Sequence, residues 1–126
     1  MILNLTFFSL CVHQIPMDMI KPPPPEPFEL RVIIWKCKNV ACKDETSGMN
    51  DLYVIANLNI PGMKSQETDT HFRAKKGKAS WNWRIKFSVH LPIKKLWPRL
   101  RLQVWDRDLL SSNDSICETT LFLKGE

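Results

Sequence analysis

The sequence contains no uninterrupted apolar run of the roughly 20 residues that a membrane-spanning helix needs. Its most apolar segment, residues 1–12, is preceded by no Lys or Arg and followed by no clear small-residue cleavage site. A secretory signal peptide carries both of these features. The sequence therefore favours an apolar lead-in segment or a stray strand over a signal peptide or a membrane anchor.

The cysteines and histidines form none of the familiar reactive arrangements. The sequence has four cysteines: Cys11, Cys37, Cys42 and Cys117. They include no C-x-x-C pair and no accompanying pair of histidines lies at zinc spacing, so we expect free thiols in a reducing cytosol. His71 and His90 have no G-x-S-x-G serine or activated cysteine to serve, so we do not expect an enzyme.

The composition indicates one folded domain with a basic surface. The 126 residues are 44% hydrophobic and include five tryptophans, which is enough to form a single core. There are 18 Lys and Arg against 13 Asp and Glu, and the surplus lies in residues 30–126. Such a surface favours an anionic partner, and charge alone does not distinguish phospholipid headgroups from nucleic acid. Trp81 and Trp83 share the apolar side of their strand and are expected in the core, so we expect no nucleic acid as a partner.

A proline-rich segment, Lys21 to Pro27, divides the chain into two parts. The run Pro22 to Pro25 is restricted to polyproline II and forms a stiff spacer. We therefore expect an apolar lead-in and linker over residues 1–27 and a folded domain over residues 28–126. The proline run also fits protein partners of the SH3 or profilin type, although the spacer interpretation is favoured.

The residues after the proline run alternate strand-like segments with loops and contain no helix of convincing length. In the clearest segment the apolar residues fall on one side of a strand: Trp81, Trp83, Ile85, Phe87 and Val89. From these we place Trp81, Trp83 and Phe87 in the core. Six strands are expected, near residues 30–34, 52–60, 67–72, 81–89, 99–105 and 116–123. Short strands separated by turn residues predict an all-β antiparallel sandwich.

Aspartates gather in two loops, each next to an apolar strand. Asp44 and Asp51 occupy one loop, and Asp106, Asp108 and Asp114 occupy the other. Carboxylates crowded in this way repel one another, and a calcium ion with roughly 6–8 oxygen ligands relieves that repulsion. A single Asp at a strand end is more often a turn former, but two such loops in one small domain favour a calcium site.

Several segments resemble the successive landmarks of a C2 domain: Leu30–Trp35, Asn50–Val54, Trp81–Trp83, and Val104–Asp108 with Asn113–Asp114. The resemblance is closer still to a C-terminal C2 domain of the ferlins, the family of dysferlin, myoferlin and otoferlin, in three segments: Phe28–Trp35, Gln66–Phe72 and Trp81–Arg84. The resemblance implies an eight-stranded Greek-key sandwich whose loops at one end bind calcium and touch phospholipid. It also implies a parent protein of membrane fusion, vesicle trafficking or membrane repair.

Carried over by position, the resemblance makes Asp44 and Asp51 the calcium ligands of the first loop. It makes Asp106, Asp108 and Asp114 those of the third loop. The first loop is one residue longer than usual, and Leu52 and Cys117 stand where the family usually has proline and glycine. A glycine would permit a loop geometry that a cysteine resists. The calcium affinity is therefore expected to be reduced.

The six expected strands are fewer than the eight that the resemblance implies, so the sandwich is expected to lack its last strand. Ferlins carry a C-terminal transmembrane helix, and this chain contains no such segment. The chain is thus expected to be a fragment or shortened product of a longer ferlin. Its expected location is the cytoplasmic face of a membrane.

Two further groups of residues point to a membrane surface. Met49, Leu109 and Leu110 are apolar residues expected at loop tips, where they suit shallow insertion into the headgroup layer. A basic loop supplies attraction for anionic headgroups: Arg73, Lys75, Lys76 and Lys78. The alternative is a calcium-independent module that binds proteins, or anionic lipid through this basic loop.

Overall fold

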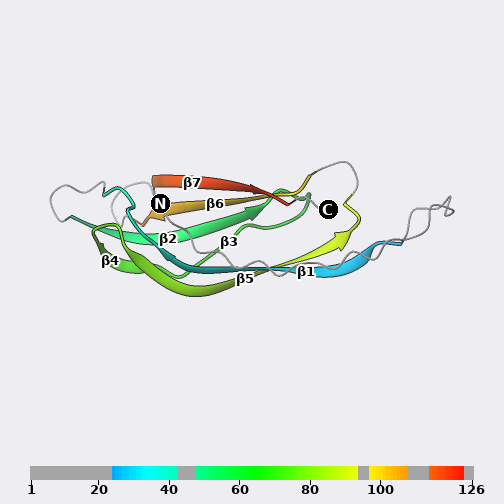
Figure 1. Cartoon of the computed structure of the whole chain (residues 1–126), viewed down its shortest axis with the longest axis horizontal. Helices are drawn as coiled ribbons and strands as arrows, with labels where there is room; N and C mark the ends of the chain where they lie inside the picture. Colours follow the sequence, from blue (N-terminus) through cyan, green and yellow to red (C-terminus); the bar gives the residue numbers. More distant parts are fainter. Residues whose placement is uncertain (1–23, 43–47, 94–96, 108–113, 124–126) are drawn as a thin grey trace.

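A computed structural model describes residues 24–42, 48–93, 97–107 and 114–123. These residues form strands and connections, with no helix among them (Figure 1). The strands are β1 (Glu26–Cys37), β2 (Met49–Leu58), β3 (Gln66–Glu67), β4 (His71–Lys75), β5 (Ala79–Leu91), β6 (Arg99–Asp106) and β7 (Asp114–Phe122). Within the described ranges, no helix is long and apolar enough to span a bilayer.

The strands form two antiparallel sheets. β1 and β5 make a two-stranded sheet, and β3, β2, β6 and β7 lie in that order in a second sheet, in which β4 also pairs with β2. Figure 1 shows β1 and β5 side by side below β2, β6 and β7. The predicted all-β sandwich is therefore confirmed.

The core lies between the two sheets and follows from the period-two pattern of the strands. From the two-stranded sheet, Ile34, Ile85 and Phe87 are at most 1% exposed. They face a layer of buried aliphatic residues from β2 and β6: Leu52, Val54, Ala56, Leu58, Leu100, Leu102 and Val104. Full burial of each large side chain stabilises the fold by about 1.5–3 kcal/mol.

The prediction of a single third strand over residues 67–72 is wrong. The structure has β3 and β4 there, separated by residues 68–70. At the break, the Val54 N–H donates to the Thr68 hydroxyl at 3.0 Å, and the Thr68 N–H donates to the Val54 carbonyl at 3.0 Å. The hydroxyl takes the place of a backbone acceptor, so the strand ladder is interrupted without leaving the Val54 amide unpaired.

The prediction that Trp83 belongs to the core is also wrong, because its side chain is 37% exposed. Trp83 pairs with Ile34, but Lys36 pairs with Ser80, so two steps along β1 match three along β5. The additional residue is a β-bulge beside Asn82, whose φ is +49°. A bulge increases the local twist and breaks the strict alternation on which the prediction rested. Trp81 is half-buried against the core.

A tight turn carries the chain from β4 in the larger sheet to β5 in the smaller one. The Lys78 N–H donates to the Lys75 carbonyl at 3.2 Å. The two central residues, Lys76 and Gly77, have φ of +53° and +61°, as a type I′ turn requires. The Gly77 carbonyl accepts the Val40 N–H at 3.1 Å. A Cβ on Gly77 would overlap the Val40 carbonyl oxygen, so only glycine fits this contact.

Candidate calcium and membrane site

Three of the predicted metal ligands come from one end of the larger sheet. β2 begins there with Asp51 near its start, β6 ends at Asp106, and β7 begins at Asp114. In the strand register Leu52 pairs with Asp106, and Asp106 pairs with Asp114. Directly paired residues in antiparallel strands have Cα atoms about 4.5–5.5 Å apart, so the sheet itself brings these positions together.

One hydrogen bond links Asp51 to Asp106, and a second links Asp51 to the next residue, Arg107. The Asp51 N–H donates to Asp106 Oδ1 at 2.8 Å, and the Arg107 N–H donates to the Asp51 carbonyl at 2.8 Å. Asp106 is only 6% exposed. A buried carboxylate is costly unless it is hydrogen-bonded or paired with positive charge. The backbone donor therefore holds the Asp106 carboxylate in a defined position at the end of β6.

The Asp51 carboxylate has its own backbone donor, from β4. The Arg73 N–H donates to Asp51 Oδ1 at 2.8 Å. Arg73 has a φ of +54°, and the register between β2 and β4 is irregular between Asn50 and Leu52. The irregularity in β4 thus accompanies a hydrogen bond to the side chain of a neighbouring strand. Asp51 Oδ2 has no hydrogen-bond partner among the described residues.

The donor chemistry of this end fits calcium, which takes carboxylate and carbonyl oxygens. The structure brings together Asp51 and Asp106 with the backbone of Asp114. Within the described ranges, no group of three or more His, Cys, Asp or Glu side chains could hold a metal ion. Asp44, Asp108 and the Asp114 side chain lie outside what the structure describes, so the five-aspartate calcium site stays a prediction.

The predicted membrane-contacting residues are partly described. Met49 is half-buried and pairs with Lys75 in the first position of β2, so it begins a strand instead of lying in the loop, and its contact with a membrane stays a prediction. Strand pairing extends β2 three residues further toward the loop than the apolar pattern indicated. Leu109 and Leu110 lie outside the described residues. Their role in insertion stays a prediction.

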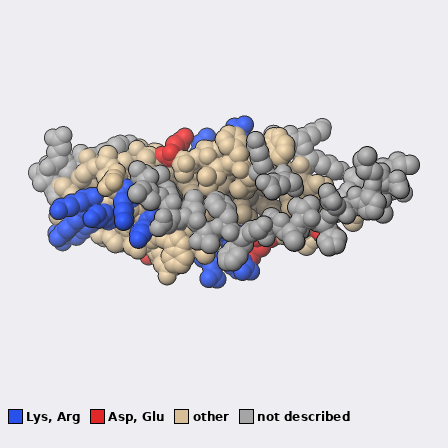
Figure 2. Space-filling view, in the orientation of Figure 1, with Lys and Arg blue, Asp and Glu red and all other residues tan. Residues whose placement is uncertain are grey.

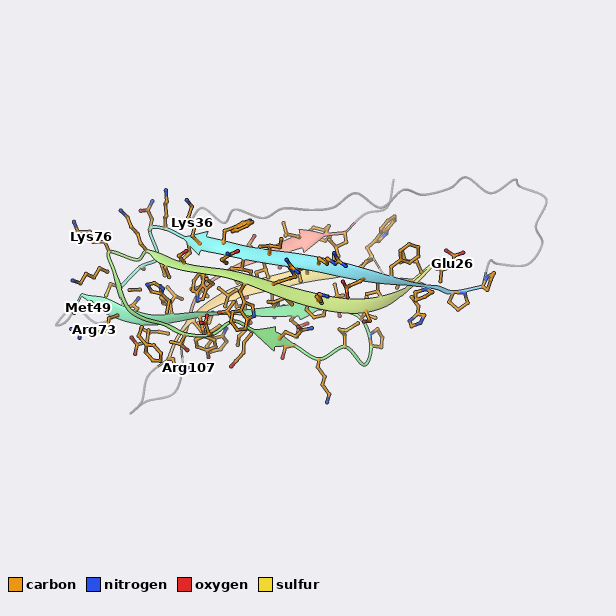
Figure 3. The ribbon with its side chains drawn as sticks, turned by 90° about the horizontal axis from the view of Figure 1, so that it is seen from below. Glu26, Lys36, Met49, Arg73, Lys76 and Arg107 are labelled. Atoms are coloured by element: carbon orange, nitrogen blue, oxygen red, sulfur yellow. The ribbon has the colours of Figure 1, made fainter. Side chains whose placement is uncertain are left out.

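The basic loop is the turn between β4 and β5 and lies at the aspartate end of the sandwich. Figure 3 shows Arg73, Lys76 and Met49 at this end, with Lys36 of β1 close by. The four predicted basic residues are all exposed: Arg73, Lys75, Lys76 and Lys78. In Figure 2, Lys and Arg side chains gather at the end of the molecule where β4 lies. Cationic groups thus lie at an end that also carries carboxylates.

Sequence reasoning missed two residues that support this end. Asn50 is 2% exposed; its Nδ2 donates to the Ala41 carbonyl at 3.0 Å, and its Oδ1 accepts the Cys42 thiol at 3.1 Å. It therefore ties the segment after β1 to the start of β2. The burial of Asn50 is visible only in the structure, and a buried amide is normally hydrogen-bonded.

Arg107 is the second missed residue. Its Nη2 lies 3.0 Å from Glu67 Oε1, and its guanidinium carbon lies 4.1 Å from the centre of the Tyr53 ring. The hydrogen bond to Glu67 raises the pKa of Arg107. The side chain following Asp106 is thereby fixed against the larger sheet, on its outward face. No motif in the sequence predicts this contact, because Glu67 is 40 positions away.

Among the described cysteines, Cys37 is buried, Cys42 exposed and Cys117 half-buried, and none of the three forms a disulfide with another described residue. Burial raises the pKa of Cys37 and of Cys117. Both thiols are therefore protonated at neutral pH and pack as small apolar groups against the core.

Comparison with known sequences identifies several relatives. The C2 domain family matches residues 28–125. Ferlin 1 of Toxoplasma gondii is 35% identical over 102 residues, covering 81% of this chain and 7% of that protein. Ferlin 2 of Tetrahymena thermophila is 34% identical over 116 residues, 87% of this chain and 7% of that protein. Human myoferlin is 33% identical over 120 residues, 75% of this chain and 6% of that protein. The chain thus spans less than a tenth of these relatives' length.

Solved structures show the same fold. A C2 domain of a plant extended synaptotagmin 1 has a TM-score of 0.64 and 21% identity, covering 75% of this chain and 67% of that one. A C2 domain of RIM from Drosophila has a TM-score of 0.62 and 16% identity, covering 75% of this chain and 74% of that one. At these identities the likeness concerns the fold alone.

Proposed function

This chain belongs to the C2 domain family and its curated relatives are ferlins, and from that premise we propose that it is a calcium-dependent phospholipid-binding module. Its parent would be a ferlin-like protein of membrane fusion, vesicle trafficking or membrane repair. The observation that carries the proposal is the position of Asp51 and Asp106, hydrogen-bonded to each other at the same end as the basic turn between β4 and β5.

A change of charge at the aspartate end would make membrane binding depend on calcium. Without calcium, the predicted ligands Asp44, Asp51, Asp106, Asp108 and Asp114 repel an anionic bilayer. These aspartates would hold calcium, and the bound charge would make that end neutral or positive and attract lipid phosphate and carboxylate oxygens. The chain's own contribution is to hold Asp106 in the protein interior and Asp51 at its edge, with backbone N–H donors that fix both carboxylates.

The basic turn adds attraction that needs no metal. Lys75, Lys76 and Lys78 are exposed, and each cation near an anionic surface contributes about 1 kcal/mol. Leu109 and Leu110 would then enter the headgroup layer, where apolar contact resists salt. The module would act without catalysis, at the cytoplasmic face of a membrane.

Thermal melting with calcium tests the metal site. Calcium should raise the melting midpoint, because a ligand that binds only the native state stabilises it. Asp106→Asn combined with Asp108→Asn should abolish this rise while the β-sheet circular dichroism stays intact. Glu26→Gln, at an exposed position at the opposite end of the molecule (Figure 3), is the matched control and should keep the rise. An unchanged calcium response in the double variant would contradict the assignment.

Cosedimentation with phosphatidylserine vesicles tests the membrane role. Binding should require calcium, weaken with salt as the Debye length falls below about 8 Å, and retain a salt-resistant part. Leu109→Glu with Leu110→Glu should remove that resistant part and leave the calcium-induced melting shift intact. Vesicle binding that persists in EGTA would favour the alternative, in which Lys75, Lys76 and Lys78 bind anionic lipid without calcium.

A further inference from the structure

The outward face of the two-stranded sheet carries a second basic surface, separate from the turn between β4 and β5. We define the side face by five residues: Arg31, Ile33, Trp35, Arg84 and Lys86. We infer that this side face is a docking surface for an acidic polypeptide segment that also presents an apolar or aromatic side chain. The inference goes beyond the proposed function, because it needs neither calcium nor lipid.

The strand register places the side-face residues next to one another. β1 and β5 pair Arg31 with Lys86 and Ile33 with Arg84. Val32, Ile34, Ile85 and Phe87, which alternate with them, are all at most 2% exposed in the core. The side chains of Arg31, Ile33, Arg84 and Lys86 therefore project outward, away from the core. The Cβ atoms of directly opposed residues in an antiparallel pair lie about 4.5–5.5 Å apart. Arg31, Arg84 and Lys86 therefore form one continuous patch with Ile33.

Local acidic groups do not neutralise this patch. Glu29 lies 2.6 Å from Arg31 Nε and 3.4 Å from Lys86 Nζ, and hydrogen bonding to Arg31 lowers the pKa of this carboxyl group. A single carboxylate is thus paired with two cations and balances only one of their charges. Arg84 is exposed and has no ion-pair partner within the described part of the chain. The side face keeps a positive excess that an acidic partner would match.

Trp35 adds an apolar contact beside the charges. Its side chain is 38% exposed although it is one of the largest apolar groups of the fold, and Ile33 next to it is half-buried. Tryptophan and arginine are the residue types most often found at the energetically dominant positions of protein interfaces. The combination fits a polypeptide that supplies both carboxylates and an apolar side chain, rather than a purely anionic polymer.

The direction of the side face favours a polypeptide over a bilayer. β1 and β5 run along the long axis of the molecule, whereas β4 lies at one tip, together with the start of β2 and the end of β6 (Figure 1). Figure 3 looks onto β1 and β5 from outside, with the strands of the larger sheet behind them. A bilayer that meets the tip therefore leaves the side face directed along the membrane plane, where neighbouring proteins lie.

The experiment uses the full chain in EGTA and a fluorescent random copolymer of glutamate and tyrosine as the probe, followed by anisotropy. The copolymer should bind more tightly than polyglutamate of the same charge. Arg84→Glu should weaken binding by about tenfold or more, as expected for loss and reversal of a central charge. Trp35→Ala should reduce copolymer binding to the level of polyglutamate.

Matched controls separate a docking surface from general charge. Lys64→Glu changes the net charge equally at an exposed position outside the side face, and Trp97→Ala removes a tryptophan that is 62% exposed elsewhere. Both should bind the copolymer as the unmodified chain does. Arg84→Gln provides the same test with a smaller perturbation, and the melting midpoint of each variant verifies folding.

Three results would overturn the inference. One is equal weakening by Lys64→Glu and Arg84→Glu, which would indicate a general effect of net charge. Another is equal affinity for polyglutamate and the copolymer. The third is displacement of the copolymer in EGTA by phosphatidylserine vesicles or by an oligonucleotide, with the same loss in Arg84→Glu, which would assign the surface to a bilayer or a nucleic acid. None of these results depends on whether calcium binds the aspartate end.

Discussion

The two sheets share one core, but three of the arginines on their outward faces are used differently. On the larger sheet, Arg107 contacts Glu67 and the Tyr53 ring, and Arg99 lies 5.0 Å from the centre of the Phe122 ring. On the smaller sheet, Arg84 has neither an ion-pair partner nor a stacked ring among the described residues. Arg107 and Arg99 therefore stabilise the fold, whereas Arg84 leaves its charge available to another molecule.

The largest expected effect comes from breaking the core that both sheets share. Phe87 is fully buried on β5, so Phe87→Ala should destabilise the domain by about 3–5 kcal/mol. Urea unfolding measures this change. Phe122→Ala, at a position 58% exposed, is the control and should cost much less. Similar losses for both variants would mean that the core does not lie between the sheets as described.

A smaller effect is expected from the turn that joins the two sheets. Gly77→Ala would force a Cβ against the Val40 backbone at a positive φ, so we expect a loss of about 2–3 kcal/mol. Gly62→Ala, also at positive φ but with no atom within 4 Å of the new Cβ, should lose only about 1 kcal/mol. Denaturant midpoints compare the two. Equal losses would show that the close contact with Val40 contributes nothing.

Trp83 tests the bulge in the smaller sheet. Because its side chain is 37% exposed, Trp83→Ala should cost about 1–2 kcal/mol, less than the roughly 3–5 kcal/mol of a fully buried aromatic residue. The loss is read from the same unfolding curves as for Phe87→Ala. A loss as large as that of Phe87→Ala would mean that Trp83 is part of the core and that the bulge does not expose it.

The smallest expected effect sharpens the comparison of the outward faces. Arg107→Ala loses an ion pair and a ring contact, so it should cost about 0.5–1.5 kcal/mol. Arg84→Ala removes no such contact and should stay within about 0.5 kcal/mol. High-precision thermal unfolding distinguishes them. If Arg84→Ala proves the more costly variant, the charge on the smaller sheet has a structural role and is not available for docking.

The buried side of a strand was predictable wherever apolar and polar residues alternate without interruption. Ile85, Phe87 and Val89 were placed on the buried side correctly because nothing disturbs the alternation there. Two of the errors in the strands arose where a single residue interrupts the ladder, at Thr68 and beside Asn82. A hydroxyl replacing a carbonyl, or an additional residue in one strand, depends on the partner strand, which a one-dimensional pattern does not contain.

The proximity of two acidic residues of the candidate site was predictable, and their surroundings were less so. Asp51 and Asp106 were expected to act together, and the register brings them together. The support from Arg73 could not be predicted, because it comes from a backbone N–H in a left-handed conformation rather than from a side chain. Arg107 and Glu67 meet only because β2 lies between their strands.

The backbone donors to Asp51 and Asp106 have a consequence for sequence variation. Every residue except proline supplies the same N–H, so other residues at positions 73 and 107 can keep the hydrogen bonds to Asp51 Oδ1 and to the Asp51 carbonyl. The positive φ at position 73 disfavours β-branched residues there. The two carboxylates have no such freedom. Evolution can therefore alter the charge surrounding this end of the molecule, and with it the choice of anionic surface, without rebuilding the geometry that holds the aspartates.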